Sequence, residues 1–160
     1  MSDAVTSPRR LLIVEDEPAL LANYKEYFEA SGFEVSATEN RDTAIDWLGW
    51  QEIDGVLSDI HLTGRDRADG LEIAFAAWKI GVPVLLITGL PTDDISNDPR
   101  LAKIAGLVRK PVSLAALHAL VESMLRKAAH DEATPDQTEI RELLRTYAPW
   151  LLAAPGPPQS

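Results

Sequence analysis

The sequence predicts an α/β fold in which a doubly wound, five-stranded parallel sheet is followed by a C-terminal helical extension. Three observations lead to this fold class. Short apolar runs recur along the chain, each run is followed by a segment whose apolar residues have helical spacing, and several runs stop abruptly at a polar residue. Uninterrupted apolar runs are typical of strands that are buried on both faces, as the strands of a parallel sheet are.

The first unit consists of a strand over residues 11–14 and a helix that begins at Pro18. The strand stops at Glu15-Asp16. Proline suits the first turn of a helix because its missing N–H needs no partner there. Gly32 is suited to end the helix. The inward stripe of this helix is Leu20, Leu21, Tyr24 and Phe28.

The middle of the chain repeats this alternation. Either Asn40 or Asp42 can cap the second helix, because both side chains accept hydrogen bonds from free N–H groups in a first turn. Asp59 follows directly on the third apolar run. The elements expected here are a strand over residues 33–38, a helix after residue 42, a strand over 53–58, a polar loop over 64–69 and a helix over 71–80.

The last part of the domain has a fourth strand over residues 84–88 and a brief fifth strand over 107–109. Residues 91–99 are rich in helix breakers, so the fourth helix should be short or irregular. Ser113 can cap a long final helix over residues 114–129.

The chain divides into a flexible leader (1–9), a domain (10–130) and a tail of linker, short amphipathic helix and disordered end (131–160). Thr134 to Gln137 resembles a capping box. Pro149 should end or kink the helix. The stripe can pack on its own domain or can face a second subunit or another partner. It consists of Ile140, Leu143, Leu144, Tyr147 and Leu151.

The composition excludes several classes of function. The 160 residues are 46% hydrophobic and contain no cysteine, which excludes disulfides, thiolate zinc ligands and thiol nucleophiles. A formal net charge of −10 argues against nucleic acid as the main partner, because the phosphate backbone attracts basic surfaces. No apolar run is long enough to span a membrane and no signal-peptide pattern opens the chain, so we expect a cytoplasmic protein.

Polar side chains gather where the predicted strands end. The first strand ends at Glu15 and Asp16, the third at Asp59, the fourth at Thr88, and Lys110 follows the fifth. Ligands of open parallel sheets bind beyond the carboxyl ends of the strands. Hard carboxylate oxygens suit Mg²⁺, and a carboxylate can act as a nucleophile toward phosphorus. Lysine and threonine can hold the transferred oxygens.

The chain resembles the receiver domains of two-component response regulators, which have a flavodoxin-like fold. The resemblance covers residues 10–129 and rests on four motifs in order, each at a strand end. These are Leu-Leu-Ile-Val-Glu-Asp-Glu-Pro from Leu11, Leu-Ser-Asp-Ile-His-Leu from Leu57 with a later Asp69-Gly70, Leu-Leu-Ile-Thr-Gly from Leu85 and Val-Arg-Lys-Pro from Val108.

The resemblance implies a role for each strand-end residue. Asp59 matches the phosphorylated aspartate, and Glu15 and Asp16 match the acidic pair that holds Mg²⁺ together with it. His61 matches the position whose backbone carbonyl binds the metal. The switch hydroxyl corresponds to Thr88, the phosphate-pairing lysine to Lys110 and the cis-proline to Pro111.

Three positions depart from the family pattern. Glu15 replaces the commoner aspartate, and Thr63 replaces the proline that usually lies four residues after the acceptor. Leu107 stands where the family usually has tyrosine or phenylalanine, so the common threonine–aromatic readout lacks its aromatic half.

We therefore expect a phosphoacceptor response regulator, not an enzyme with a separate substrate. A histidine kinase or histidine phosphotransfer protein would donate the phosphoryl group. A homodimer or an output protein could bind through the fourth helix, fifth strand, last receiver helix or tail. One alternative is a receiver-shaped binding module that works without phosphorylation. Another is an aspartyl-nucleophile phosphatase, which would need a general acid where this chain has His61.

Overall fold

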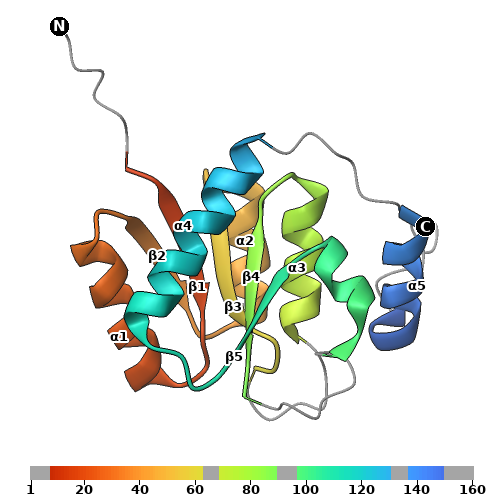
Figure 1. Ribbon diagram of the computed structural model, residues 1–160, viewed down its shortest axis with the longest axis horizontal. Helices are drawn as coiled ribbons and strands as arrows, with labels where there is room; N and C mark the ends of the chain where they lie inside the picture. The colour runs from red at the N-terminus through yellow and green to blue at the C-terminus, as the bar shows by residue number, and fades with distance from the viewer. Residues whose placement is uncertain (1–7, 63–68, 90–96, 131–136, 150–160) are drawn as a thin grey trace, which may run out of the picture.

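The computed structural model describes residues 8–62, 69–89, 97–130 and 137–149. Five parallel strands form one sheet in the order β2-β1-β3-β4-β5 (Figure 1). The strands are β1 (Arg10–Val14), β2 (Glu34–Thr38), β3 (Gly55–Asp59), β4 (Val84–Thr88) and β5 (Gly106–Arg109). The helices are α1 (Pro18–Ala30), α2 (Arg41–Trp50), α3 (Asp69–Lys79), η2 (Pro99–Lys103), α4 (Leu114–His130) and α5 (Gln137–Tyr147). The predicted fold class is confirmed.

Helices cover both faces of the sheet, α1 and α4 one face and α2 and α3 the other (Figure 1). The core consequently has two parts. Tyr24 and Phe28 of α1 pack with Leu117 and Val121 of α4 on one side. On the other side, residues of α2 and α3 join those of η2 and α5 in a single apolar cluster. The central strands β3 and β4 are buried along their whole length, which explains why they are mostly apolar up to the polar residues at their carboxyl ends.

Local sequence signals set the ends of the helices. Asn40, not Asp42, caps α2, because its side-chain oxygen accepts a hydrogen bond from the Thr43 N–H at 3.0 Å. Ser113 caps α4 by accepting a bond from the Ala116 N–H at 3.0 Å. Residues Pro99–Lys103 form the short 3₁₀ helix η2, whereas residues 91–96 of the breaker-rich segment lie outside the described residues. Among the described helices, none has the length and apolar character needed to cross a membrane.

The tail helix α5 packs on η2 within its own chain (Figure 1). The described leucine and isoleucine side chains of its stripe are buried in the same cluster as Leu101 and Ile104, and Tyr147 is half-buried against this cluster. The Tyr147 hydroxyl donates to Asp98 at 3.1 Å, and this carboxylate also pairs with Arg100 at 2.6 Å. The buried residues of α5 are Ile140, Leu143 and Leu144, and Ala148 just after it is buried as well. Leu151 and residues 134–136 of the predicted capping box lie outside the described residues.

Candidate functional site

Three carboxylates meet at the carboxyl edge of the sheet. Carboxylate oxygens of Glu15, Asp16 and Asp59 lie within 4.8 Å of one another. Glu15 and Asp16 follow β1, and Asp59 ends β3, which pairs directly with β1. Glu15 is 2% exposed and Asp59 7%. This parallel pairing places the two strand ends side by side, as the sequence predicted.

Lys110 reaches this cluster from the far side of β4. Its Nζ lies 3.0 Å from Oδ2 of Asp59 and 3.3 Å from Oε1 of Glu15. The Lys110 N–H donates to the Thr88 carbonyl at 2.8 Å, which ties the lysine to the end of β4. The peptide bond between Lys110 and Pro111 is cis, as the sequence motif predicted.

The charges of the cluster are not balanced. Burial raises the pKa of Glu15 to about 7, the charge of Asp59 and a hydrogen bond with Asp16 add to the rise, and Lys110 only partly opposes it. Burial lowers the pKa of Lys110, but its bonds to Asp59 and Glu15 outweigh this and raise it above the ordinary value. One ammonium therefore faces three crowded carboxylates. A divalent cation would relieve this repulsion, so the donor set fits Mg²⁺.

Thr88 and His61 are placed beside the cluster in different ways. Thr88 ends β4 and is buried, one strand away from Asp59. His61 comes two residues after Asp59 and is half-buried. The metal-binding role assigned to its backbone carbonyl, and the switch role of Thr88, stay predictions.

Two neighbours of the site went unrecognised in the sequence. Burial raises the pKa of the Tyr24 phenol above its ordinary value. Lys110 opposes this shift, whereas the carboxylates of Glu15 and Asp59 add to it, so Tyr24 lies within the electrostatic reach of the site. Its place on the inward stripe of α1 suggested only a core residue.

Gly70 is the second unrecognised neighbour. Its N–H donates to the Ile60 carbonyl at 2.7 Å. A Cβ at this position would collide with the Asp59 carbonyl oxygen and lie 2.6 Å from Cα of Ile60. Gly70 is therefore required at this position, because only glycine lets α3 approach the acceptor's backbone so closely. Asp69-Gly70 belongs to the second sequence motif, but that motif gives no sign of this close contact.

The acidic cluster lies at the point where strand order reverses, between β1 and β3, which is where open α/β sheets typically bind their ligands. Comparison with known families specifies the kind of domain. The family described as "Response regulator receiver domain" matches residues 11–122. The chain belongs to this family of two-component signalling proteins.

Individual relatives agree with the family match. The transcriptional activator protein PfeR of Pseudomonas aeruginosa is 33% identical over 128 residues, which are 80% of this chain and 41% of that protein. The response regulator MprA of Mycobacterium sp. is 27% identical over 151 residues, covering 89% of this chain and 61% of that protein. The chain thus spans only part of the length of these curated relatives.

Solved structures agree as well. A response regulator receiver protein from Sinorhizobium medicae is 26% identical, with a TM-score of 0.65 over 76% of this chain and 97% of its own. A CheY-like receiver domain from Methanospirillum hungatei is 25% identical, with a TM-score of 0.67 over 77% of this chain and 98% of its own.

Proposed function

We propose that Asp59 is the phosphoryl acceptor of this receiver domain, and that it works with Mg²⁺ held by Glu15, Asp16, Asp59 itself and the His61 carbonyl. The observation that carries the proposal is the cluster of three carboxylates faced by one lysine, since it leaves negative charge that a cation can neutralise. Bound Mg²⁺ would supply positive charge next to the transferred oxygens.

The phosphoryl donor is a histidine kinase or a histidine phosphotransfer protein. A carboxylate oxygen of Asp59 forms a bond to phosphorus while the bond between phosphorus and the donor's imidazole nitrogen breaks. The imidazole keeps the electron pair and takes up a proton. Lys110, already 3.0 Å from Asp59, then pairs with the phosphoryl oxygens, and the Thr88 hydroxyl donates to one of them.

The protein acts as a cytoplasmic signalling component that catalyses only its own phosphorylation and dephosphorylation. Its output is contact with another copy or another protein, through η2, β5, α4 or the tail. In this structure α5 packs on η2, so a partner that binds the same face of η2 has to displace α5. Leu107 packs against the same apolar cluster as α5, which offers a route from β5 to the tail without an aromatic switch residue.

Phosphorylation with acetyl phosphate and Mg²⁺, and adduct formation with beryllofluoride, test the proposal. We expect one phosphoryl group per chain in the wild type, none in Asp59→Asn and none without Mg²⁺. Asp46→Asn, an exposed acid on α2, is the matched control and should be labelled normally. A wild-type protein that takes up no label from acetyl phosphate, beryllofluoride or any histidine kinase would instead favour the phosphorylation-independent binding module.

The phosphatase alternative predicts a different result. It requires repeated turnover of generic phosphate esters such as p-nitrophenyl phosphate, with release of inorganic phosphate. We expect no turnover beyond the slow loss of one phosphoryl group per chain, because the half-buried His61 occupies the position at which such enzymes use a carboxylic acid.

A further inference from the structure

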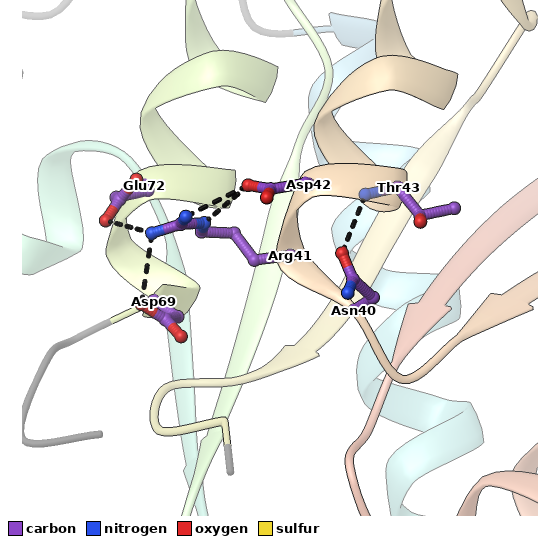
Figure 2. Close-up of polar contacts among 6 residues, drawn as sticks. All are labelled: Asn40, Arg41, Asp42, Thr43, Asp69 and Glu72. Carbon is purple, nitrogen blue, oxygen red and sulfur yellow. Dashed lines mark hydrogen bonds and ion pairs between the residues drawn. The ribbon is translucent and has the colours of Figure 1, made fainter. Parts of the chain in front are cut away.

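A second cluster of charged residues joins α2 to α3, close to the site but not part of it (Figure 2). Nη1 of Arg41 lies 2.9 Å from Oε1 of Glu72 and 3.4 Å from Oδ1 of Asp69. The side chains are 18%, 8% and 6% exposed, respectively. We call these three residues the Arg41 clamp. Removing the guanidinium would leave two buried carboxylates without a cation, which is strongly unfavourable.

The position of Arg41 on α2 does not help α2 itself. Arg41 is the first residue of the helix, where a positive charge opposes the helix dipole. Asn40 caps this helix end, so the next residue, Arg41, is the first residue of the helix (Figure 2). Asp69 and Glu72, in contrast, lie in the first turn of α3, where negative charge is favourable. The arginine therefore acts on α3.

The first turn of α3 is in turn packed on the backbone of the phosphoryl acceptor. Gly70 lies between the two clamped acids, and its N–H bonds to the Ile60 carbonyl. Its Cα is so close to the Asp59 and Ile60 backbone that no Cβ fits. Whatever holds Asp69 and Glu72 in place therefore holds the chain directly after Asp59, where the metal-binding carbonyl of His61 is assigned.

We propose that Arg41 is a positioning residue for the receiver site: through Asp69 and Glu72 it presses Gly70 onto the acceptor's backbone and fixes the geometry of the metal-binding loop. This rests on the proposed Mg²⁺-dependent function. Partners that orient metal ligands without touching the metal are typically worth a factor of about 10 to 100 in metal affinity.

The test compares Arg41→Gln with wild type in two measurements. Calorimetric titration with Mg²⁺ should give binding about tenfold weaker in the variant. Amide hydrogen exchange in the metal-free protein should show faster exchange of the Gly70 N–H, which does not depend on any phosphorylation activity. Arg41→Lys keeps the charge and should bind Mg²⁺ more tightly than Arg41→Gln. Gly70→Ala should weaken Mg²⁺ binding at least as much, because its Cβ has no room.

Two controls separate positioning from general loss of stability. Asp42→Asn removes a 79% exposed partner of Arg41 and should leave Mg²⁺ affinity and Gly70 exchange unchanged. Val121→Ala lowers stability from the opposite face of the sheet and should leave Mg²⁺ affinity unchanged. If Arg41→Gln loses only stability and binds Mg²⁺ like Val121→Ala, the inference is wrong. If the wild type itself binds no Mg²⁺, the proposed function fails, and unchanged Gly70 exchange in Arg41→Gln would still overturn the positioning role.

Discussion

The Asp59 site and the Arg41 clamp are built from the same kinds of residue, yet their charges are arranged differently. Each combines buried carboxylates with one basic side chain. In the clamp, a guanidinium reaches two buried acids and keeps a third, exposed partner in Asp42. In the site, one ammonium serves two of three crowded acids, and the pKa of Glu15 rises to about 7.

The difference separates a structural cluster from a functional one. Arginine offers several donors in a fixed geometry, which suits a permanent connection between two helices. Lysine is a compact charge on a flexible stem, which can stay with Asp59 or follow a phosphoryl group. Each cluster has one positive charge against three acids, but the third acid at the clamp, Asp42, is 79% exposed to solvent, whereas Glu15 and Asp59 of the site are both buried, with Asp16 close beside them. Crowded charges that shift a pKa, as they do for Glu15, are expected at functional sites.

The largest effect that tests this contrast is expected in the pH dependence of the free energy of unfolding without Mg²⁺. The pKa of Glu15 is raised in the folded protein, so its favourable contribution is complete below about pH 4.5 and is lost as pH rises through about 7. We expect urea unfolding to show a loss of about 3 kcal/mol across this range. Saturating Mg²⁺ should remove most of the loss, and Glu15→Gln should abolish the slope. A flat profile in the metal-free wild type would contradict the unbalanced site.

Neutralising one acid in each cluster should change stability in opposite directions. Asp59→Asn relieves repulsion in the site and should raise the free energy of unfolding by about 1 kcal/mol at pH 7.5 without Mg²⁺. Glu72→Gln removes a charge-assisted bond from the clamp and should lower it by about 2 kcal/mol. Thermal and urea unfolding of both variants measure this. Two changes of the same sign would end the distinction between the clusters.

Asp98 offers a balanced acid with the opposite pH response. Its bonds to Arg100 lower its pKa to about 2, with a further bond from Tyr147. A lowered pKa means that the contribution is present above pH 3.8 and is lost as pH falls toward 2. We expect this loss to be about 2 kcal/mol, and Asp98→Asn should remove it. Urea unfolding between pH 2 and 5 provides the measurement; an equal slope in the variant would assign the loss to other acids.

The smallest effect should come from Tyr147→Phe, which removes one hydrogen bond to Asp98 and leaves its pairing with Arg100 intact. We expect a loss of about 1 kcal/mol in the free energy of unfolding. Tyr27→Phe, a change of the same kind on α1, is the control. Faster amide exchange confined to α5 would locate the effect in the tail helix, and equal effects of the two variants would argue against the bond.

The sequence predicted the fold and the centre of the site because both depend on local patterns. Apolar runs set the strands, and the parallel arrangement brings the residues that end them to one edge. The sequence therefore predicts that Glu15, Asp16, Asp59 and Lys110 lie together, and the structure shows them in proximity.

What the sequence did not predict depends on contacts between distant elements. Arg41 meets Asp69 and Glu72 across two helices, and no spacing rule relates residues that far apart. Gly70 carries no visible signal for its close approach to the acceptor. The stripe of α5 was recognised as apolar, but its pattern is equally suited to packing in its own chain or on a partner. The structure shows that the stripe packs on its own chain, because it shares an apolar cluster with η2.

The position of α5 has a consequence for any protein that recognises the face of η2 on which α5 packs. Because α5 is covalently joined to the domain by residues 131–136, it competes at a high effective concentration that does not change with dilution. An incoming protein must therefore outcompete a tethered ligand. It can bind only those chains in which α5 is undocked, and because this fraction is small, its apparent affinity is lower than its intrinsic affinity. The tail thus sets a threshold for recognition, which any event that loosens the bonds of Asp98 would lower.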